Sequence, residues 1–148
     1  MRGKFTSIKL FSKVHGYIYH VSRGRLGATT GPKLSFLLLT TRGNKSGKHR
    51  SVPLTAIPHR ESYVVVASFG GSPVNPSWLT NIRHNSTVQI RIGPVVQTAE
   101  SEIIEPSHPL YGGLWAKAVK IYKGYNKYKQ ATSREIPLVI LTPVTSQF

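Results

Sequence analysis

Residues 34–68 read LSFLLLTTRGNKSGKHRSVPLTAIPHRESYVVVAS, and they predict the centre of a β-rich fold. Residues 34–41 form a short apolar run of the length and composition of a buried strand. A turn with two glycines, residues 42–48, follows it, and residues 50–57 resume as a second strand. After another turn, residues 63–68 carry the strongest strand pattern of the chain. We therefore expect the three strands to form an antiparallel meander.

The chain outside this stretch predicts three helices and further short strands. Apolar residues recur every three or four positions in residues 4–22, which predicts a basic amphipathic helix within residues 1–24. A second helix is expected to begin at Asn75-Pro76 and to end near Asn85. Because no repeat or low-complexity linker interrupts the sequence, residues 25–148 are expected to form one domain, and 148 residues are enough for one core.

The C-terminal half adds two paired strands, an aromatic helix and a final strand. Residues 88–92 alternate apolar and polar side chains, and residues 95–104 are expected to pair back onto them. Aromatic and apolar residues then follow at helical spacing, with Gly124 as an expected break. Residues 136–141 predict a last strand, placed at a sheet edge because of Pro137. The whole pattern predicts a small barrel or rolled sheet covered by helices.

Composition excludes several kinds of chemistry and points to an anionic partner. The chain has 20 Lys and Arg but only 5 Asp and Glu, which gives a net charge of +15. It contains no Cys and no Asp, so disulfides, thiolate catalysis, paired-Asp sites and Asp-based metal cages are excluded. The histidines lack metal-ligand spacing, and no metal site is expected. No apolar run reaches the ~20 residues that a membrane span needs, so a cytoplasmic location is expected.

The sharpest local motif is the basic turn, which we define as residues 42–50 (RGNKSGKHR). Two glycines can present backbone N–H groups, and four Lys and Arg side chains supply charge, so the turn can hold a phosphate or carboxylate. The alternative is a solvated basic hairpin. The loop at Gly70-Gly71 allows a ligand to approach the backbone, although this motif taken alone favours an ordinary flexible loop.

Tyrosines at three-residue spacing form a further motif on the aromatic helix. Tyr122, Tyr125 and Tyr128 are either a packed aromatic stripe or a set in which one hydroxyl faces a site. The lysines of the same segment predict a solvated helix face, or an extension of an anion groove; they are Lys117, Lys120, Lys123 and Lys127.

The order of these motifs resembles one enzyme family. The resemblance is carried by residues 37–41, the basic turn with Pro53-Leu54, Val66-Ala67-Ser68 with Gly70-Gly71, Asn75-Pro76-Ser77-Trp78 with Asn81, Ile82 and Asn85, and residues 132–137. Together they resemble the nitroreductase-like family of deazaflavin-dependent oxidoreductases, which use coenzyme F420, an 8-hydroxy-5-deazaflavin. The resemblance covers roughly residues 25–143 and implies a split β-barrel of the kind shared with flavin-binding oxidases, with an N-terminal helix and helices covering the barrel.

The resemblance also implies a set of site residues. The cofactor would be bound by Asn44, Lys45, Ser46, Arg50, Ser51, Val52, Pro53, Leu54, Thr55, Val66, Ala67, Ser68, Phe69, Ser77, Trp78, Leu79, Thr80, Asn81 and Tyr125. Of these, the basic turn and the stretch to Thr55 would hold the phosphate and the acidic tail. Thr55, Tyr122 and Tyr128 would form the substrate pocket. Ser68 and Tyr125 would be the catalytic residues, polarising the oxygen of the acceptor.

The function implied is hydride transfer from reduced coenzyme F420 to a small electrophile, a quinone or a nitroaromatic compound. One alternative is an oxidoreductase that binds flavin mononucleotide (FMN) in the same barrel. Another is a basic nucleic-acid-binding module without enzymatic activity, which the charge permits but for which no binding motif is present. The basic helix predicted for residues 4–22 would additionally allow peripheral attachment to an anionic membrane surface, at the inner membrane face.

Overall fold

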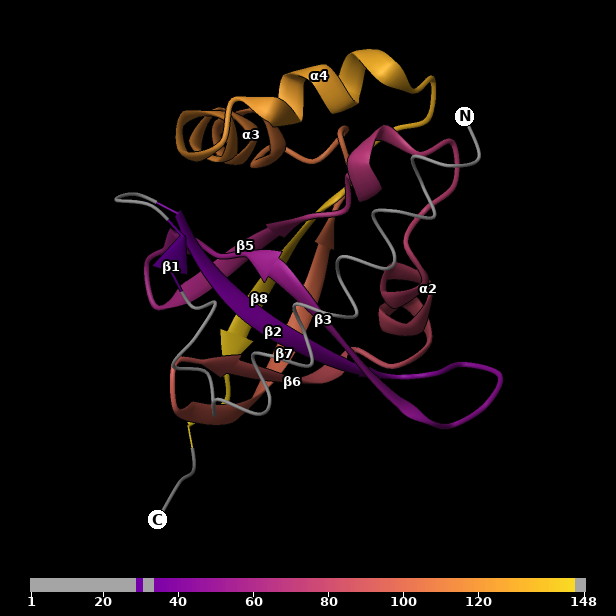
Figure 1. The fold of residues 1–148 in the computed structure, drawn as a ribbon, viewed down its shortest axis with the longest axis vertical. Coiled ribbons are helices and arrows are strands. Elements are labelled where there is room, and N and C mark those ends of the chain that lie inside the picture. Colours follow the sequence, from indigo (N-terminus) through magenta and orange to yellow (C-terminus); the bar gives the residue numbers. More distant parts are fainter. Residues whose placement is uncertain (1–28, 31–33, 146–148) are drawn as a thin grey trace.

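The computed structural model describes residues 29–30 and 34–145 (Figure 1). The amphipathic helix predicted within residues 1–24 lies outside the described residues. Among the described residues, no helix is long and apolar enough to cross a lipid bilayer.

The described residues form eight strands in one antiparallel sheet, together with three α-helices and a 3-10 turn. The strands are β1 (Thr29–Thr30), β2 (Leu34–Arg42), β3 (His49–Thr55), β4 (Ile57–His59), β5 (Ser62–Val66), β6 (Thr87–Ile92), β7 (Val95–Ile104) and β8 (Leu138–Pro143). The helices are η1 (Phe69–Gly71), α2 (Ser77–His84), α3 (Tyr111–Ile121) and α4 (Gly124–Ala131). The strand order is β1-β2-β6-β7-β8-β5-β4, and β3 also pairs with β2.

One chain segment joins the two ends of this sheet. β3 pairs with β2 at one end and β4 pairs with β5 at the other, and only Ala56 separates β3 from β4. The N–H group of Ala56 donates to the carbonyl oxygen of Ser35 at 2.8 Å, so the bend still belongs to the sheet. The sheet is thereby curled into a barrel, as expected. The predicted strand 50–57 and its meander are wrong in detail, because this strand divides at Ala56 and β3 does not pair with β5.

The last strand lies inside the sheet and not at its edge. β8 pairs with β5 on one side and with β7 on the other. The prediction from Pro137 was wrong because this proline precedes the first residue of β8. Its carbonyl oxygen still accepts a hydrogen bond from Ala67 N–H at 3.0 Å. Because proline has no N–H group, it contributes an acceptor but no donor to the hydrogen bonding of the sheet.

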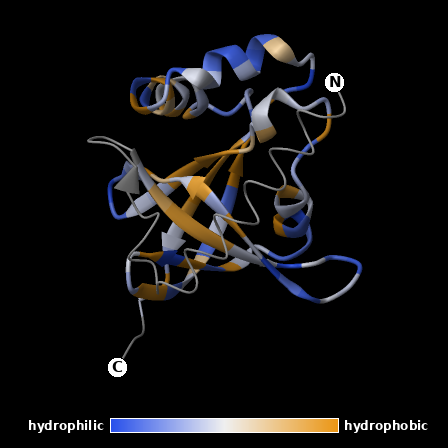
Figure 2. Cartoon of the chain, in the orientation of Figure 1, coloured by the Kyte–Doolittle hydropathy of each residue, from blue (hydrophilic) through white to orange (hydrophobic). Residues whose placement is uncertain are grey.

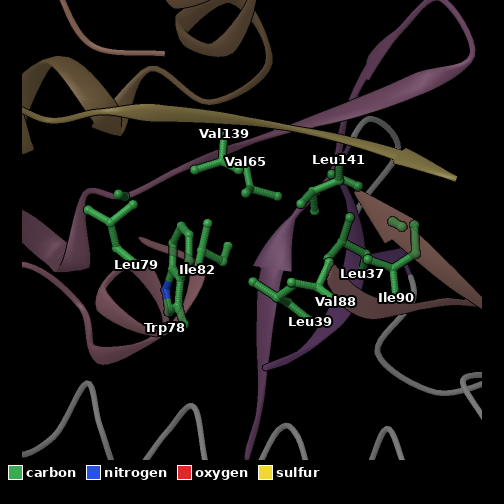
Figure 3. Close-up of a cluster of buried hydrophobic side chains, with 13 residues drawn as sticks. Leu37, Leu39, Val65, Trp78, Leu79, Ile82, Val88, Ile90, Val139 and Leu141 are labelled. Atoms are coloured by element: carbon green, nitrogen blue, oxygen red, sulfur yellow. The ribbon is translucent and has the colours of Figure 1, made fainter. Parts of the chain in front are cut away.

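Alternation along the strands builds two apolar layers. Val65, Val139 and Leu141 face the barrel interior, where they pack with residues of β2, β6 and α2 (Figure 3). Their neighbours Val64, Val66, Leu138 and Ile140 face outward, against α3 and α4. β5 and β8 are therefore buried on both faces, which explains why their sequences are continuous apolar runs. Full burial of one such side chain contributes about 1.5–3 kcal/mol.

The helices fix the two ends of the functional region. α2 contributes Trp78, Leu79 and Ile82 to the interior layer, and it begins just after Pro76 as expected (Figure 3). α3 and α4 cover the outer face of β5 and β8. The break predicted at Gly124 is confirmed, since α4 begins there. A Cβ atom at Gly124 would lie 2.5 Å from Cζ of Tyr122, so the ring can fold back only over glycine.

Candidate functional site

The basic turn is closed by its own backbone. Gly43 N–H donates to the Lys48 carbonyl at 2.7 Å, and Gly47 N–H donates to the Gly43 carbonyl at 2.9 Å. Gly47 has a φ of 70°, a conformation that favours glycine. The N–H groups of Lys45 and Ser46 have no acceptor among the described residues. The turn is therefore a defined loop with two backbone donors available to an anion.

Asn81 ties this turn to α2. Its side-chain Oδ1 accepts a hydrogen bond from Asn44 N–H at 3.1 Å, and its Nδ2 donates to Thr41 Oγ1 at 3.0 Å. Asn81 is only 8% exposed; its bond to Thr41 is buried, and its bond from Asn44 is partly buried. The structure thus brings the predicted residues Asn44 and Asn81 together, 37 positions apart in the sequence.

The charge of the turn is not neutralised by the described part of the protein. Arg42, Lys45, Lys48, His49 and Arg50 are all exposed at the tip and root of the hairpin. The described residues contain one ion pair, which lies elsewhere, between Arg83 and Glu105 at 2.8 Å. Figure 2 shows the hairpin as a hydrophilic projection beside α2. Like charges gathered without a counterion favour the binding of an anion.

A hollow of about 270 Å³ lies at the root of the hairpin. Its lining includes Arg42 and His49, together with hydroxyl and amide side chains of β2, β6 and β7. None of the predicted site residues lines it. Apart from Arg42 and His49, which belong to the basic turn, the lining of the hollow is uncharged.

The predicted tyrosines meet at the other end of the region. The rings of Tyr122 and Tyr125 lie 5.1 Å apart at nearly a right angle, and Tyr122 Oη is 3.1 Å from Tyr128 Oη. Tyr125 is 5% exposed, and its hydroxyl forms a hydrogen bond with the Thr55 side chain of β3. The structure therefore joins Thr55, Tyr122, Tyr125 and Tyr128 in one group.

Burial keeps these hydroxyls protonated. It raises the pKa of Tyr125 to about 12, although the hydrogen bond with Thr55 acts in the opposite direction. The pKa of Tyr128 is also raised to about 12, first by burial and then by its hydrogen bond to Tyr122. Near neutral pH a protonated phenol is a hydrogen-bond donor, and it can polarise a carbonyl oxygen.

The chain after β5 forms a tight loop against α4. Phe69, Gly70 and Gly71 all have positive φ values, of 43°, 63° and 78°. Gly71 N–H donates to the Ser68 carbonyl at 2.9 Å. A Cβ atom on Gly71 would lie 3.0 Å from the Tyr128 carbonyl oxygen, so glycine is required for this approach. Ser68 itself is buried, with 7% of its surface exposed.

Arg134 holds this loop, and the sequence analysis gave it no role. Its guanidinium donates to the carbonyl oxygens of Ala67 at 3.1 Å, Ser68 at 2.9 Å and Ser72 at 2.9 Å. The one sequence signal was its place in residues 132–137, one of the segments that carried the family resemblance. Nothing in that signal indicates a contact with carbonyls more than 60 positions away.

Some predicted site residues have side chains that serve the core. Trp78, Leu79 and Ala67 belong to the interior layer, and Val66 belongs to the layer under α3 and α4. Val52 and Leu54 pack against the interior layer. The Ser51 hydroxyl lies 2.7 Å from that of Thr40. The exposed predicted residues are Asn44, Lys45, Ser46, Arg50, Ser77 and Thr80, while Pro53 is half-buried and Phe69 is partly exposed.

The predicted residues thus form three groups. They are the basic turn with Asn81, the loop after β5 with Arg134, and the tyrosine group with Thr55. In the view of Figure 1, α2 lies between the hairpin and α4. The cations of the basic turn would suit the anionic end of an elongated ligand. The tyrosine group would suit an aromatic ring at its other end.

Comparison with known proteins bears on the family of this chain. Residues 11–143 match the model of the family described as F420H(2)-dependent quinone reductase. The chain belongs to this family. It is therefore an oxidoreductase of a family that uses coenzyme F420, which confirms the resemblance found in the sequence.

Individual relatives point the same way. The chain is 34% identical over 131 residues to an F420H(2)-dependent quinone reductase of Mycobacterium tuberculosis, covering 88% of each chain. A solved structure named as an F420-H2 dependent reductase (FDR-A) has 37% identity and a TM-score of 0.64, covering 72% of this chain and 92% of the other. An FMN-binding protein related to pyridoxamine 5'-phosphate oxidase, from Nostoc punctiforme, has 12% identity and a TM-score of 0.51, covering 89% and 79%. The last similarity concerns the fold alone, a split β-barrel.

Proposed function

We propose that this protein transfers a hydride from reduced coenzyme F420 to a quinone. The observation that carries the proposal is the basic turn, which has no counterion in the described structure and is held against α2 by Asn81. When bound, the coenzyme supplies a hydride from carbon 5 of its reduced ring. The residues of this chain then have to bind, orient and shield the reacting partners.

The residues present fit the charged part of the coenzyme. Its phosphodiester and oligoglutamate tail are anionic, and the turn offers Lys45, Lys48 and Arg50 as exposed cations. The N–H groups of Lys45 and Ser46, which have no acceptor among the described residues, can add neutral hydrogen bonds to phosphate oxygens. In this proposal the turn would hold the tail, and the loop after β5 and the tyrosine group would hold the ring.

The residues at the other end fit the ring and the acceptor. Ser68 and Phe69 stand at the loop after β5, while Thr55 and Tyr125 join β3 to α4. Burial outweighs the opposite effect of Thr55 and raises the pKa of Tyr125 to about 12, so its phenol stays protonated near neutral pH. The Tyr125 proton is then available to an acceptor oxygen. We assign Tyr125 the polarisation of the quinone carbonyl, with Ser68 as a second donor.

Nitroaromatic compounds are proposed as further acceptors. Their nitro oxygens can accept the same hydrogen bond from Tyr125. The aromatic group of Tyr122 and Tyr128 offers a surface on which either class of ring can pack. A comparison of turnover with a soluble quinone analogue and with a nitroaromatic compound measures this preference.

The test of the proposed function is cofactor binding. Fluorescence titration is expected to give tighter binding of coenzyme F420 than of FMN or a nicotinamide cofactor. Equal or tighter binding of FMN would replace the proposal with an FMN-binding oxidoreductase. Tight, salt-dependent binding of DNA without cofactor binding would instead favour the nucleic-acid-binding alternative.

Two variants test the role of the turn. Lys45→Ala and Arg50→Ala each remove a charge-assisted hydrogen bond of roughly 1.5–3 kcal/mol. This corresponds to a loss of about ten- to a hundredfold in cofactor affinity. Lys120→Ala, an exposed lysine on α3, is the matched control and is expected to bind like the wild type. Added salt should weaken wild-type binding more than Lys45→Ala binding, because one screened contact is already absent.

A further inference from the structure

Arg134 is an arginine surrounded by backbone carbonyls. Its Nε donates to the Ser72 carbonyl, its Nη2 to those of Ala67 and Ser68, and its Nη1 to that of Glu135, at distances of 2.9–3.1 Å. In the described part of the chain it makes no ion pair. A partly buried cation whose partners are all neutral is unusual, because burial disfavours charge that no anion balances.

These bonds set the shape of the loop after β5. Within the described part of the chain, the loop makes two backbone hydrogen bonds of its own, from Gly71 N–H to the Ser68 carbonyl and from Ser72 N–H to the Phe69 carbonyl. Phe69 adopts a φ of 43°, which is unfavourable for a residue with a side chain. Such a conformation persists only where the surroundings impose it. Arg134 bonds to carbonyls on both sides of Phe69 and therefore imposes it.

The same bonds act on the peptide groups electrically. In a planar trans peptide the C=O and N–H groups point in opposite directions. Because the Ala67 carbonyl faces Arg134, the N–H group of Ser68 points away from it. A cation at the carbonyl end of a peptide dipole strengthens the N–H at the other end as a donor.

The donor strengthened in this way has no acceptor in the described structure. Ala67 N–H donates to the Pro137 carbonyl, whereas no described residue accepts from Ser68 N–H. Ser68 is nevertheless buried, with 7% of its surface exposed. An unused donor at a buried position that a guanidinium polarises is a group prepared for a ligand.

We propose that Arg134 is a positioning residue that shapes residues 67–72 and strengthens the Ser68 N–H as a donor to a carbonyl oxygen of the deazaflavin ring. The ring part of this inference rests on the proposed function. The loop part concerns the protein alone. Arg134 acts on the peptide groups in two ways: its hydrogen bonds shape the loop, and its charge polarises the Ser68 N–H group. Two substitutions distinguish these two effects.

Arg134→Met removes the charge and the donors at similar length. Arg134→Lys keeps the charge, but its donors lie on one nitrogen and cannot reproduce the bonds that Nε, Nη1 and Nη2 of Arg134 make. Arg83→Met is the matched control, because Arg83 is an exposed arginine with a single ion pair. Arg134→Gln replaces Arg134→Met if the latter does not fold, since it is neutral and keeps one donor.

The first measurement uses the protein without cofactor. Hydrogen exchange at the Gly71 and Ser72 amides is expected to accelerate at least tenfold in Arg134→Met and Arg134→Lys but not in Arg83→Met. Unchanged exchange in the Arg134 variants would overturn the inference, whether or not the protein binds coenzyme F420.

The second measurement is a titration of bound, oxidised coenzyme F420. Arg134→Met is expected to weaken binding at least tenfold and to raise the apparent pKa of the ring hydroxyl, followed by its absorbance, because a nearby positive charge is lost. Arg134→Lys should weaken binding but leave that pKa close to the wild-type value. If Arg134→Met matches the wild type both in its affinity for coenzyme F420 and in the apparent pKa of the ring hydroxyl, the inference is wrong. If the wild type itself does not bind, the proposed function fails, and the exchange measurement still decides the loop part.

Discussion

Replacement of Asn81 by alanine is expected to destabilise the protein and to detach the basic turn from α2. The change removes the hydrogen bonds to Thr41 Oγ1 and from Asn44 N–H. Two such bonds contribute about 1 kcal/mol each, and the Thr41 hydroxyl, 3% exposed, is left without this partner at a further cost of up to about 2 kcal/mol. The free energy of unfolding should therefore fall by about 2–4 kcal/mol. For a chain of this size, that lowers Tm by about 6–12 °C.

Thermal and urea unfolding measure this loss, and two further variants make it specific. Thr80→Ala changes an exposed side chain on the same helix and should stay within about 0.5 kcal/mol of the wild type. Thr41→Val removes the partner hydroxyl at nearly constant volume. Asn81→Ala and Thr41→Val should couple by about 1 kcal/mol in a double-mutant cycle, since they share one bond.

The outcome that would refute this reasoning is an Asn81→Ala protein as stable as the wild type. It would mean that the turn and α2 are not joined in solution. Additive effects of the two substitutions would lead to the same conclusion. If the link is real, Asn81→Ala should also weaken binding of coenzyme F420, because the cations of the turn lose their fixed position relative to α2.

Three further predictions follow from the loop and the tyrosines. Gly71→Ala should destabilise the protein by about 1–3 kcal/mol in urea unfolding, because φ is 78° and the new Cβ would meet the backbone of α4; Gly112→Ala, where no atom lies within 4 Å, should be neutral or stabilising by up to about 1 kcal/mol. Tyr125→Phe should lower kcat with a soluble quinone analogue more than it raises the Kd for coenzyme F420, and an unchanged rate would assign Tyr125 to packing alone. The pKa values of Tyr111, Tyr125 and Tyr128 are raised from 10.0 to about 12, so their contribution to stability should be complete below pH 10 and lost as the pH rises towards 12, as followed by unfolding at a series of pH values.

Most elements could be predicted from local sequence. The strand predicted for residues 95–104 is β7 as observed, and the strand predicted for 88–92 differs from β6 by one residue. The helix after Pro76 and the break at Gly124 are confirmed. These features depend on side-chain periodicity and on the conformational limits of Pro and Gly, which act over a few residues.

Strand pairing could not be predicted in the same way. The apolar pattern of residues 63–68 indicates a strand buried on both faces, but it does not indicate that the partner is β8, near the other end of the chain. The bend at Ala56 has no glycine or proline of its own to mark it. Both features arise from closure of the sheet, which is a property of the whole chain.

In the candidate site, too, local features could be predicted from the sequence and long-range contacts could not. The basic turn is visible in sequence because its charges are contiguous, and the tyrosines are visible because they share a helical period. The contacts that position them, from Asn81 to Asn44 and from Arg134 to Ala67, join segments 37 and 67 positions apart. The family resemblance named Asn81 without its contacts, and only the structure gives Arg134 a role.

The closure of the sheet by residues 49–59 has a consequence for how the protein acquires its site. The β2–β3 hairpin is local and can form early, whereas β5 must wait for β8, which is synthesised more than 70 residues later. Thr55 ends the early hairpin, and Ser68 follows the late pairing of β5 with β8. Under the proposed function, the turn that would hold the tail is therefore complete before the loop that would hold the ring. A ligand that requires both ends recognises only the completed barrel, and each tenfold excess of that ligand over its Kd should slow the loss of the native state to proteolysis by about tenfold.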